Sequence, residues 1–301
     1  MSSDIITEFR GRGDQVHVYP LSFKEFYEYR NIDFNEAYKE YSLYGGMPLV
    51  LKYNTNEEKS NYLKKLFIEV YLKDIIERNR LLNVNEFNNV IDIIASSIGT
   101  YTNSIKLEKT FISEMNINYS HTLIEKHIEY LVDSFLISVA TRYDIKGKKY
   151  LKANYKYYFS DLGLRNAKLS FRQFKPTPIM ENIIYNELII RGYNVDVGIV
   201  EKNEKNSEGK YVRKQLEVDF VVNKNDERIY IQSVYSLSSL EKIKQETKSL
   251  KNIKDSFRKV IIVNDNIKSY RNSDGIQILS LKEFLTSHNC FNNIVSILLK
   301  M

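Results

Sequence analysis

Apolar residues in the first half of the chain recur every three or four positions, which is the spacing of amphipathic helices. The pattern predicts a strand at 15–19, then helices that begin after Ser22 and at 34–43, 57–80, 84–98, 105–116 and 119–134. The helix at 57–80 places Leu63, Leu66, Phe67, Val70, Tyr71 and Ile75 on one inward face. Ser22 and Glu25 predict a capping box, and the glycines of YGGMP at 44–48 predict a turn.

The pattern changes after residue 134 from helical spacing to alternation. Residues 135–161 alternate and turn like a β-hairpin with a basic tip at Lys146–Lys149. A helix, a short turn, a second helix and a two-stranded hairpin are the layout of a winged helix-turn-helix. The sequence therefore predicts a winged-helix-like region in this part of the chain.

Strands and helices alternate in the last third. Pro176 and Pro178 in FRQFKPTPI, 171–179, predict a break in regular structure and a domain boundary. After it the pattern predicts helices at 178–191, 239–251, 281–287 and 291–299, strands at 193–200, 214–222, 229–235, 258–263 and 276–279, and a polar hairpin tip at 201–210. This alternation is typical of an α/β domain, so the expected fold class is α+β with several domains.

Composition agrees with a globular protein of 301 residues, 43% hydrophobic and 27% charged. The single cysteine, Cys290, excludes an internal disulfide and a cysteine metal cluster. No apolar run is long enough to cross a bilayer, and the opening residues lack the pattern of a secretory signal. We therefore expect a cytoplasmic protein without a membrane partner.

Positive charge is concentrated in one stretch. The net charge is +6, and residues 141–175 hold ten Lys and Arg against two acids. Tyrosines and phenylalanines lie between these cations, a mixture that suits phosphate neutralisation with aromatic packing. The expected nucleic-acid-binding residues are Arg142, Lys146, Lys148, Lys149, Lys152 and Lys156. The alternative is a solvated hairpin whose aromatic side chains belong to the core.

Two carboxylates lie close together in the strand predicted at 214–222. Glu217 and Asp219 are two positions apart, so both point to the same face of a regular strand. Like charges at this spacing repel unless a cation lies between them. Glu181 or Glu187 on the preceding helix could add an oxygen ligand for Mg²⁺. The alternative is an ordinary edge strand with its polar face in water.

Three stretches together resemble one known family. They are FRGRGDQVHVYPLSFKEF followed by YGGMP, then RYDIKGKKYL with YYFSDLGLRNA, then MENIIYNELIIRGYNVDVG with LEVDFVV and IYIQSVYSL. In this order they resemble the bacterial and archaeal AAA-type ATPases that carry the C-terminal domain of unknown function number 4143. The resemblance spans nearly the whole chain.

The resemblance implies that an ATPase domain comes first and that residues 1–30 are only the remnant of its end. Arg10 and Arg12 match a basic element of that domain. The chain has no G-x-x-x-x-G-K-[ST] loop, so ATP is expected only in a full-length protein. The implied domains are this remnant at 1–30, a helical and winged-helix-like domain at 31–170, and a restriction-endonuclease-like α/β domain at 171–301.

A restriction-endonuclease-like fold usually carries an acid, then an acid–x–lysine on the next strand. By that resemblance Asp219 matches the first acid, Gln232 replaces the second, and Val234 replaces the lysine. Lys242 or Lys248 could substitute for the missing lysine. The degenerate catalytic set is therefore Glu181, Asp219 and Gln232, and Asp219 with Glu181 are the candidate metal ligands.

Three functions remain open. The first is a non-catalytic platform that binds nucleic acid or a partner and carries a degenerate nuclease-like domain. The second is a Mg²⁺- or Mn²⁺-dependent DNA nuclease with a migrated lysine. The third is a protein-interaction module that contacts an acidic partner or a separately encoded ATPase half, without nucleic acid.

Overall fold

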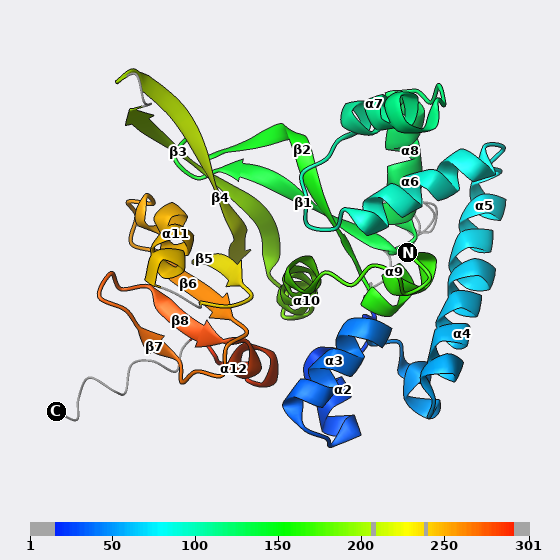
Figure 1. Ribbon diagram of the computed structural model, residues 1–301, viewed down its shortest axis with the longest axis horizontal. Helices are drawn as coiled ribbons and strands as arrows, with labels where there is room; N and C mark the ends of the chain where they lie inside the picture. Colours follow the sequence, from blue (N-terminus) through cyan, green and yellow to red (C-terminus); the bar gives the residue numbers. More distant parts are fainter. Residues whose placement is uncertain (1–15, 206–208, 238–239, 292–301) are drawn as a thin grey trace. The chain divides into compact units, whose positions relative to one another are not determined.

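Two compact units make up the chain in a computed structural model that describes residues 16–205, 209–237 and 240–291. Unit 1 comprises 1–139 and 154–182, and unit 2 comprises 140–153 and 183–301. The division passes through β1 (Ile137–Asp144), β2 (Lys149–Phe159) and α10 (Pro176–Ile190). Helices dominate the first unit and a sheet the second (Figure 1), so the α+β class is confirmed.

Unit 1 is built mostly from helices in the predicted ranges, with two short helices, at 48–52 and 162–168, that were not predicted. The helices are α2 (Phe23–Arg30), α3 (Phe34–Tyr44), η1 (Pro48–Lys52), α4 (Asn56–Leu66), η2 (Phe67–Leu72), α5 (Lys73–Asn79), α6 (Val84–Ser96), α7 (Ser104–Met115), α8 (His121–Asp133) and α9 (Leu162–Lys168). The predicted capping box is present: the backbone N–H of Ser22 donates to Glu25, 2.8 Å, and that of Glu25 donates to Ser22 Oγ, 3.2 Å. In the described part of the chain no helix has both the length and the apolarity to cross a membrane.

The strand predicted at 15–19 is wrong for the residues that the structure describes. Residues 16–19 are not part of a sheet, and Val16 and Val18 are 83% and 85% exposed. The ring of His17 instead packs on Phe135, with centroids 4.7 Å apart. Alternation alone does not make a strand, because a strand needs a neighbour for its backbone hydrogen bonds.

The helix predicted at 57–80 is interrupted by a turn of π-helix. In η2 the backbone N–H of Lys73 donates to the carbonyl of Ile68, five residues back. Such a turn holds more residues than an α-turn and shifts the apolar stripe around the axis. Val70 is 54% exposed, so its predicted inward position is wrong, while Phe67 and Ile75 are buried as expected.

Unit 2 is a mixed sheet covered by helices. Its strands lie in the order β2-β1-β3-β4-β5-β6-β8-β7. Beyond the hairpin they are β3 (Asn194–Lys205), β4 (Tyr211–Lys224), β5 (Glu227–Val234), β6 (Arg258–Val263), β7 (Tyr270–Arg271) and β8 (Gln277–Ser280), with helices α11 (Leu240–Lys251) and α12 (Leu281–Thr286). β1 with β3, β5 with β6 and β6 with β8 are parallel, and the other pairs from β3 onward are antiparallel.

The apolar core of unit 2 lies between the sheet and α11. Val218, Val234 and Ile261 from the sheet pack with Leu250 of the helix, and all are buried. On the other face the ring of Phe220 lies against Tyr185 of α10. Apolar side chains therefore cover both faces of the central strands, which explains their long hydrophobic runs.

Two boundaries in this half differ from the prediction. β3 runs on to Lys205 and β4 begins at Tyr211, so the hairpin tip predicted at 201–210 is shorter than expected. Pro176 is the first residue of α10 rather than a break, because the first turn of a helix needs no donor from proline. The helix predicted at 291–299 lies almost wholly outside the described residues.

Candidate nucleic-acid interface

The turn between β1 and β2 carries the exposed part of the predicted basic surface. Lys146, Lys148 and Lys149 are all exposed. The backbone N–H of Gly147 donates to Asp144 Oδ1, 2.9 Å, which fixes the turn through a carboxylate. Arg142 Nη2 donates to Gln215 Oε1, 3.1 Å. Lys152 belongs to β2, but its side chain lies outside the described ones.

A second basic element, missed by sequence reasoning, lies beside this turn. β1 pairs with β3 up to Asp144 and Ile199, and the N–H of Ile145 donates to the carbonyl of Ile199, 3.0 Å. Beyond that point β3 and β4 continue as an antiparallel pair, which we call the β3–β4 arm, residues 201–205 and 211–215 (Figure 1). Its cations are Lys202, Lys205, Arg213 and Lys214, with Lys210 just before β4.

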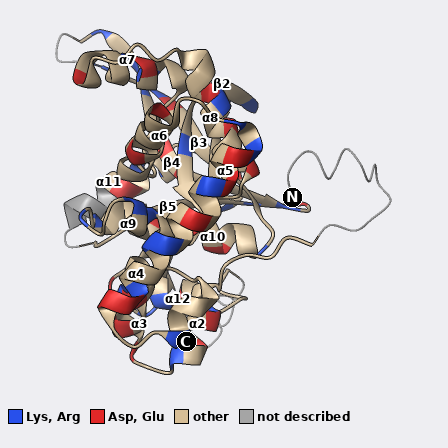
Figure 2. Cartoon of the chain, turned by 90° about the vertical axis from the view of Figure 1, so that its right-hand side faces the viewer, with Lys and Arg blue, Asp and Glu red and all other residues tan. Residues whose placement is uncertain are grey.

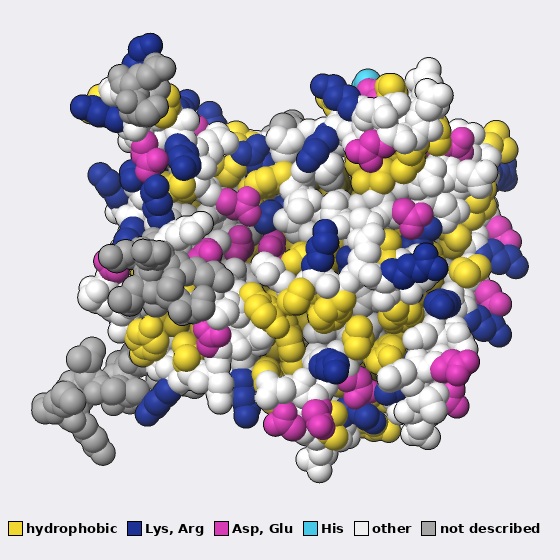
Figure 3. Space-filling model, viewed as in Figure 1, with side chains coloured by type: hydrophobic (Ala, Val, Ile, Leu, Met, Phe, Trp, Pro, Cys, Tyr) yellow, Lys and Arg dark blue, Asp and Glu magenta, His cyan; other side chains and the backbone are white. Residues whose placement is uncertain are grey.

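Turn and arm together form a surface of positive charge. Residues 140–153 and 199–216 hold ten Lys and Arg and four acids, a surplus equal to the net charge of the whole chain. Lys and Arg side chains gather over the arm in Figure 3. Such a surface concentrates polyanions through long-range attraction and counterion release.

Neighbouring cations neutralise the acids of the arm. Glu204 lies 2.6 Å from Lys248 Nζ of α11 and 3.0 Å from Lys202 Nζ. These two ammonium groups lower the pKa of Glu204 to about 2, so it stays ionised at neutral pH. Glu201 forms an ion pair with Arg213. The acids therefore hold the cations in place, and they also cancel part of the positive charge of the arm.

Lys156 is buried, not part of the nucleic-acid surface as predicted. Only 3% of it is exposed, and its ammonium donates to Glu181 Oε1, 2.9 Å. The Tyr158 hydroxyl donates to the same oxygen, 2.6 Å. The two strand residues and Glu181 of α10 thus form one buried polar cluster in unit 1. A carboxylate held in this way serves a structural role here, and Lys156 is out of reach of a phosphate.

Two other cations of the surplus also point inward within unit 1. Arg165 is 1% exposed and donates to the carbonyls of Ala95, 2.8 Å, and Gln173, 2.7 Å. Burial lowers the pKa of Arg165 to about 10, which leaves it charged at neutral pH. Lys168 pairs with Asp92, 3.1 Å. The charge count of the sequence therefore overstates the charge available to a partner.

Asp219, the central residue of the expected nuclease site, lies at an irregularity of β4. The pairing with β3 shifts between Asp196 and Gly198, so two residues of β4, 219 and 220, face one of β3. This is the pattern of a β-bulge, and bulges often redirect a side chain. Asp219 Oδ2 accepts from the backbone N–H of Ser233, 2.7 Å. Regular pairing of β4 with β5 ends at Phe220 and Ile231. Just beyond this pair, the Asp219 carboxylate supplies one more hydrogen bond between the two strands.

The positions matched to the second acid and the lysine lie under α11. Gln232 Oε1 accepts from Ser249 Oγ at 3.4 Å, and Val234 is 3% exposed among Val218 and Leu250. A lysine at Val234 would lie in an apolar core. Lys248 is bound to Glu204, the side chain of Lys242 is not described, and Glu187 pairs with Arg191, 2.8 Å. Within the described ranges no three His, Cys, Asp or Glu side chains are placed to hold a metal ion.

A buried carboxylate that the sequence did not single out organises unit 1. Asp161 caps α9, accepting from the N–H of Leu164 at Oδ1, 3.0 Å, and from the N–H of Gly46 at Oδ2, 2.7 Å. Gly45 has φ +70°, and a Cβ there would lie 2.3 Å from the same carboxylate. Gly45 of the predicted turn is therefore required by close approach to Asp161, while a Cβ at Gly46 would lie 2.2 Å from the carbonyl oxygen of Leu21. Burial raises its pKa to about 6, although these donors favour the ionised form.

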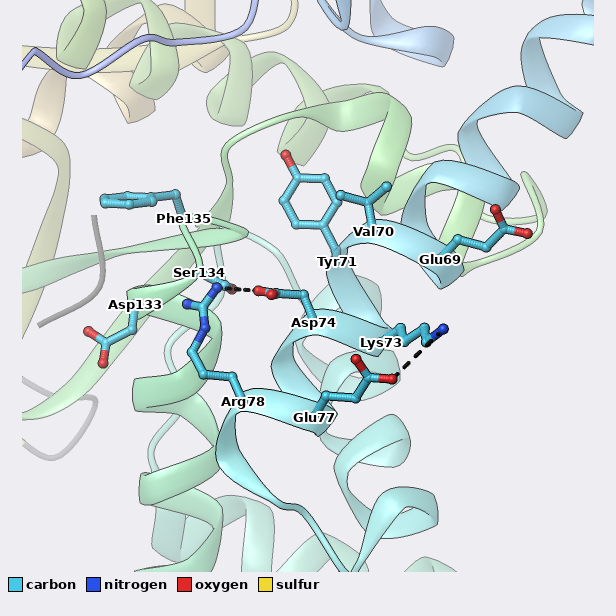
Figure 4. A pocket seen from close by; sticks show the side chains of 10 residues that line it. All are labelled: Glu69, Val70, Tyr71, Lys73, Asp74, Glu77, Arg78, Asp133, Ser134 and Phe135. Atoms are coloured by element: carbon cyan, nitrogen blue, oxygen red, sulfur yellow. Dashed lines mark hydrogen bonds and ion pairs between the residues drawn. The ribbon is translucent and has the colours of Figure 1, made fainter. Parts of the chain in front are cut away.

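Unit 1 also has an open groove of about 740 Å³ along η2 and α5 (Figure 4). Its lining residues are Glu69, Val70, Tyr71, Lys73, Asp74, Glu77, Arg78, Asp133, Ser134 and Phe135. Four of them are acids and two are bases. Lys73 pairs with Glu77, and Arg78 with Asp74, one helical turn apart. Figure 2 shows the same mixture of both charges along α4 and α5.

Comparison with known proteins places the chain among uncharacterized relatives. It is 32% identical over 292 residues to an uncharacterized protein of Haemophilus influenzae, covering 95% of this chain and 68% of that protein. It is 29% identical to the uncharacterized protein MJ1544 of Methanocaldococcus jannaschii, covering 88% of this chain and 60% of the relative. The chain thus spans only about two thirds of these relatives.

A solved structure and a domain family were also matched. The crystal structure of protein VC1899 from Vibrio cholerae is similar over 79% of this chain and 57% of that one, with 12% identity and a TM-score of 0.25, which is too low to carry an argument. Residues 35–175 match the family described as "Domain of unknown function (DUF8612)". By its identity and coverage, the chain belongs to the family of the uncharacterized Haemophilus influenzae protein.

Proposed function

We propose that this chain is the C-terminal portion of an ATPase-linked protein and that it binds nucleic acid without cleaving it. The observation that carries the proposal is the pair of neighbouring basic elements in unit 2, the β1–β2 turn and the β3–β4 arm. Ten cations against four acids on these two stretches suit a phosphate backbone. The greater length of the curated relatives leaves room for an ATPase part, where ATP would bind.

The same proposal includes a more specific fold assignment for two parts of the chain. In it, α7, α8 and the β1–β2 hairpin are a winged-helix-like element, and the sheet from β3 to β6 is restriction-endonuclease-like. The nuclease chemistry is absent because an amide, Gln232, and an isopropyl group, Val234, replace a metal-binding anion and a catalytic cation. The packing of Val234 in an apolar core supports this interpretation.

Binding of a labelled DNA duplex across a range of salt concentrations tests the proposal. We expect the logarithm of the association constant to fall linearly with the logarithm of salt concentration. Substituting Lys146, Lys148 and Lys149 together by Ala should reduce the slope by up to about 2.7, or about 0.9 for each lost phosphate contact. A matched control replaces three exposed lysines of unit 1, Lys39, Lys52 and Lys65, by Ala and should leave the slope unchanged.

Two outcomes contradict the proposal. One is absent or salt-independent binding, and the other is an equal loss in the control variant. Copurification with a protein in the absence of nucleic acid, together with either outcome, would favour the protein-interaction alternative. In that alternative an acidic partner would contact the exposed lysines of the β1–β2 turn.

A further inference from the structure

The β3–β4 arm has two chemically different faces. Its cross-strand pairs are Glu201 with Gln215, Lys202 with Lys214, Asn203 with Arg213, Glu204 with Val212, and Lys205 with Tyr211. Directly opposite residues share a face, and faces alternate along each strand. One face therefore carries Lys202, Lys214, Glu204 and Val212. The other, which we call the amide face, carries Glu201, Asn203, Lys205, Tyr211, Arg213 and Gln215.

The amide face points away from α11. Val200 and Leu216, at the base of the arm, pack in the core under α11, so the face that they share with Lys202 and Glu204 is the α11 side. Lys248 of α11 reaches Glu204 on that side, 2.6 Å. Asn203, Arg213 and Gln215 lie on the opposite side and are exposed.

The side chains of the amide face have the chemistry that reads base edges. An arginine guanidinium bonds two acceptors of guanine, and an asparagine or glutamine amide bonds an acceptor and a donor of adenine. The major groove of B-DNA admits a two-stranded β-ribbon, which is the form of this arm. The lysines of the adjacent β1–β2 turn are available for the phosphates on the rim of the groove.

We propose that the β3–β4 arm enters the major groove of duplex DNA and reads base sequence through Asn203, Arg213 and Gln215. This inference rests on the proposed nucleic-acid function and adds that binding is sequence-selective. Without DNA, two of these groups bond neighbouring side chains: Arg213 pairs with Glu201, and Gln215 accepts from Arg142. Exposed pairs of this kind are weak, so the edges of bases can replace them.

The same geometry separates DNA from duplex RNA. The major groove of A-form RNA is deep and narrow, and side chains cannot read it. A duplex RNA competitor should therefore displace the preferred DNA no better than a scrambled DNA duplex does, because it offers only its phosphate charge.

Selection from a randomised DNA duplex library, followed by anisotropy titrations of the selected and a scrambled duplex, tests the inference. Wild type should prefer the selected duplex. Arg213→Lys keeps the charge, so affinity for the scrambled duplex and its salt dependence should stay unchanged. Preference at one base position should fall by up to about 5- to 150-fold, because the ammonium of lysine lacks the rigid planar fork of the guanidinium. Asn203→Ala should relax a different position, and the triple lysine variant should weaken both duplexes equally.

The outcomes separate this inference from the function on which it rests. Salt-dependent binding without any sequence preference overturns the inference but agrees with the proposed nucleic-acid-binding function. A preference that survives both Arg213→Lys and Asn203→Ala overturns the role of the arm, as does competition by duplex RNA equal to that by the selected DNA. Absence of binding to every duplex overturns both proposals.

Discussion

Charged side chains serve opposite purposes in the two units. In unit 1, Asp161, Arg165 and the Lys156–Glu181 pair are buried, and protein groups bond each of them. In unit 2, the cations of the β1–β2 turn and of the β3–β4 arm project into solvent or pair weakly at the surface. Burial makes a charge depend on its partner, while exposure leaves it available to a ligand.

This difference assigns a separate measurable consequence to each group of charges. Removing a buried charge or its partner should change the free energy of unfolding and leave surface chemistry alone. Removing an exposed cation should change binding with little effect on stability. The three predictions that follow test this separation from the largest expected change in stability to the smallest.

The largest effect is expected for Glu181→Leu. The substitution removes the carboxylate that accepts from Lys156 and Tyr158 and leaves a buried ammonium without it. Breaking a buried pair on one side typically costs about 3–5 kcal/mol. Denaturant unfolding measures the loss. The double variant Lys156→Met with Glu181→Leu should recover most of it, because two apolar groups replace both charges. A single-variant loss below about 1 kcal/mol would contradict a structural role for the pair.

An intermediate effect, dependent on pH, is expected from Asp161. Its pKa is raised to about 6 in the folded protein, so folding takes up a proton between the unfolded and folded values. Stability from this group is present at low pH and is lost as pH rises from about 4 to about 6, by about 3 kcal/mol. Asp161→Asn cannot ionise and should flatten that part of the profile. Unfolding curves of both proteins between pH 4 and pH 7 measure the difference, and identical slopes would rule out the assignment.

The smallest effect on stability is expected for the combined substitution of Lys146, Lys148 and Lys149 by Ala. Exposed substitutions away from caps and networks usually change the free energy of unfolding by no more than about 0.5 kcal/mol. Thermal unfolding beside the wild type checks this value. A loss as large as that of Glu181→Leu would mean that the turn is structural, and the contrast between the units would fail.

Helix positions were predictable from the sequence because burial of one face imposes a period that local residues carry by themselves. α6, α7 and α8 agree with the predicted ranges within two residues at each end, and β6 agrees at both ends. The predictions fail where the local conformation depends on a partner that is distant in sequence. Residues 16–19 alternate yet find no neighbouring strand, and the π-turn of η2 rotates Val70 outward.

The candidate site was only partly predictable for a similar reason. Exposure of Lys146, Lys148 and Lys149 follows from a turn that carries no apolar residue except Ile145. Lys156 also lies between tyrosines in the same basic stretch, so its sequence context does not distinguish it from the exposed lysines. Only the fold shows that Glu181, 25 positions later, binds it. The arm was missed because both of its faces are polar, so its strands lack the alternation that signals burial.

The path of the chain limits how this protein can be divided. Unit 2 draws its outer strands from residues 140–153, far from the rest of that unit in sequence. A fragment that starts at the predicted boundary of 171 would lack β1 and would leave the backbone of β3 as an open sheet edge, the kind of edge on which foreign strands assemble. Removing the first 170 residues therefore removes the strand that pairs with β3 next to the β3–β4 arm. Recombinant fragments should keep residues 140–153 together with the rest of the sheet.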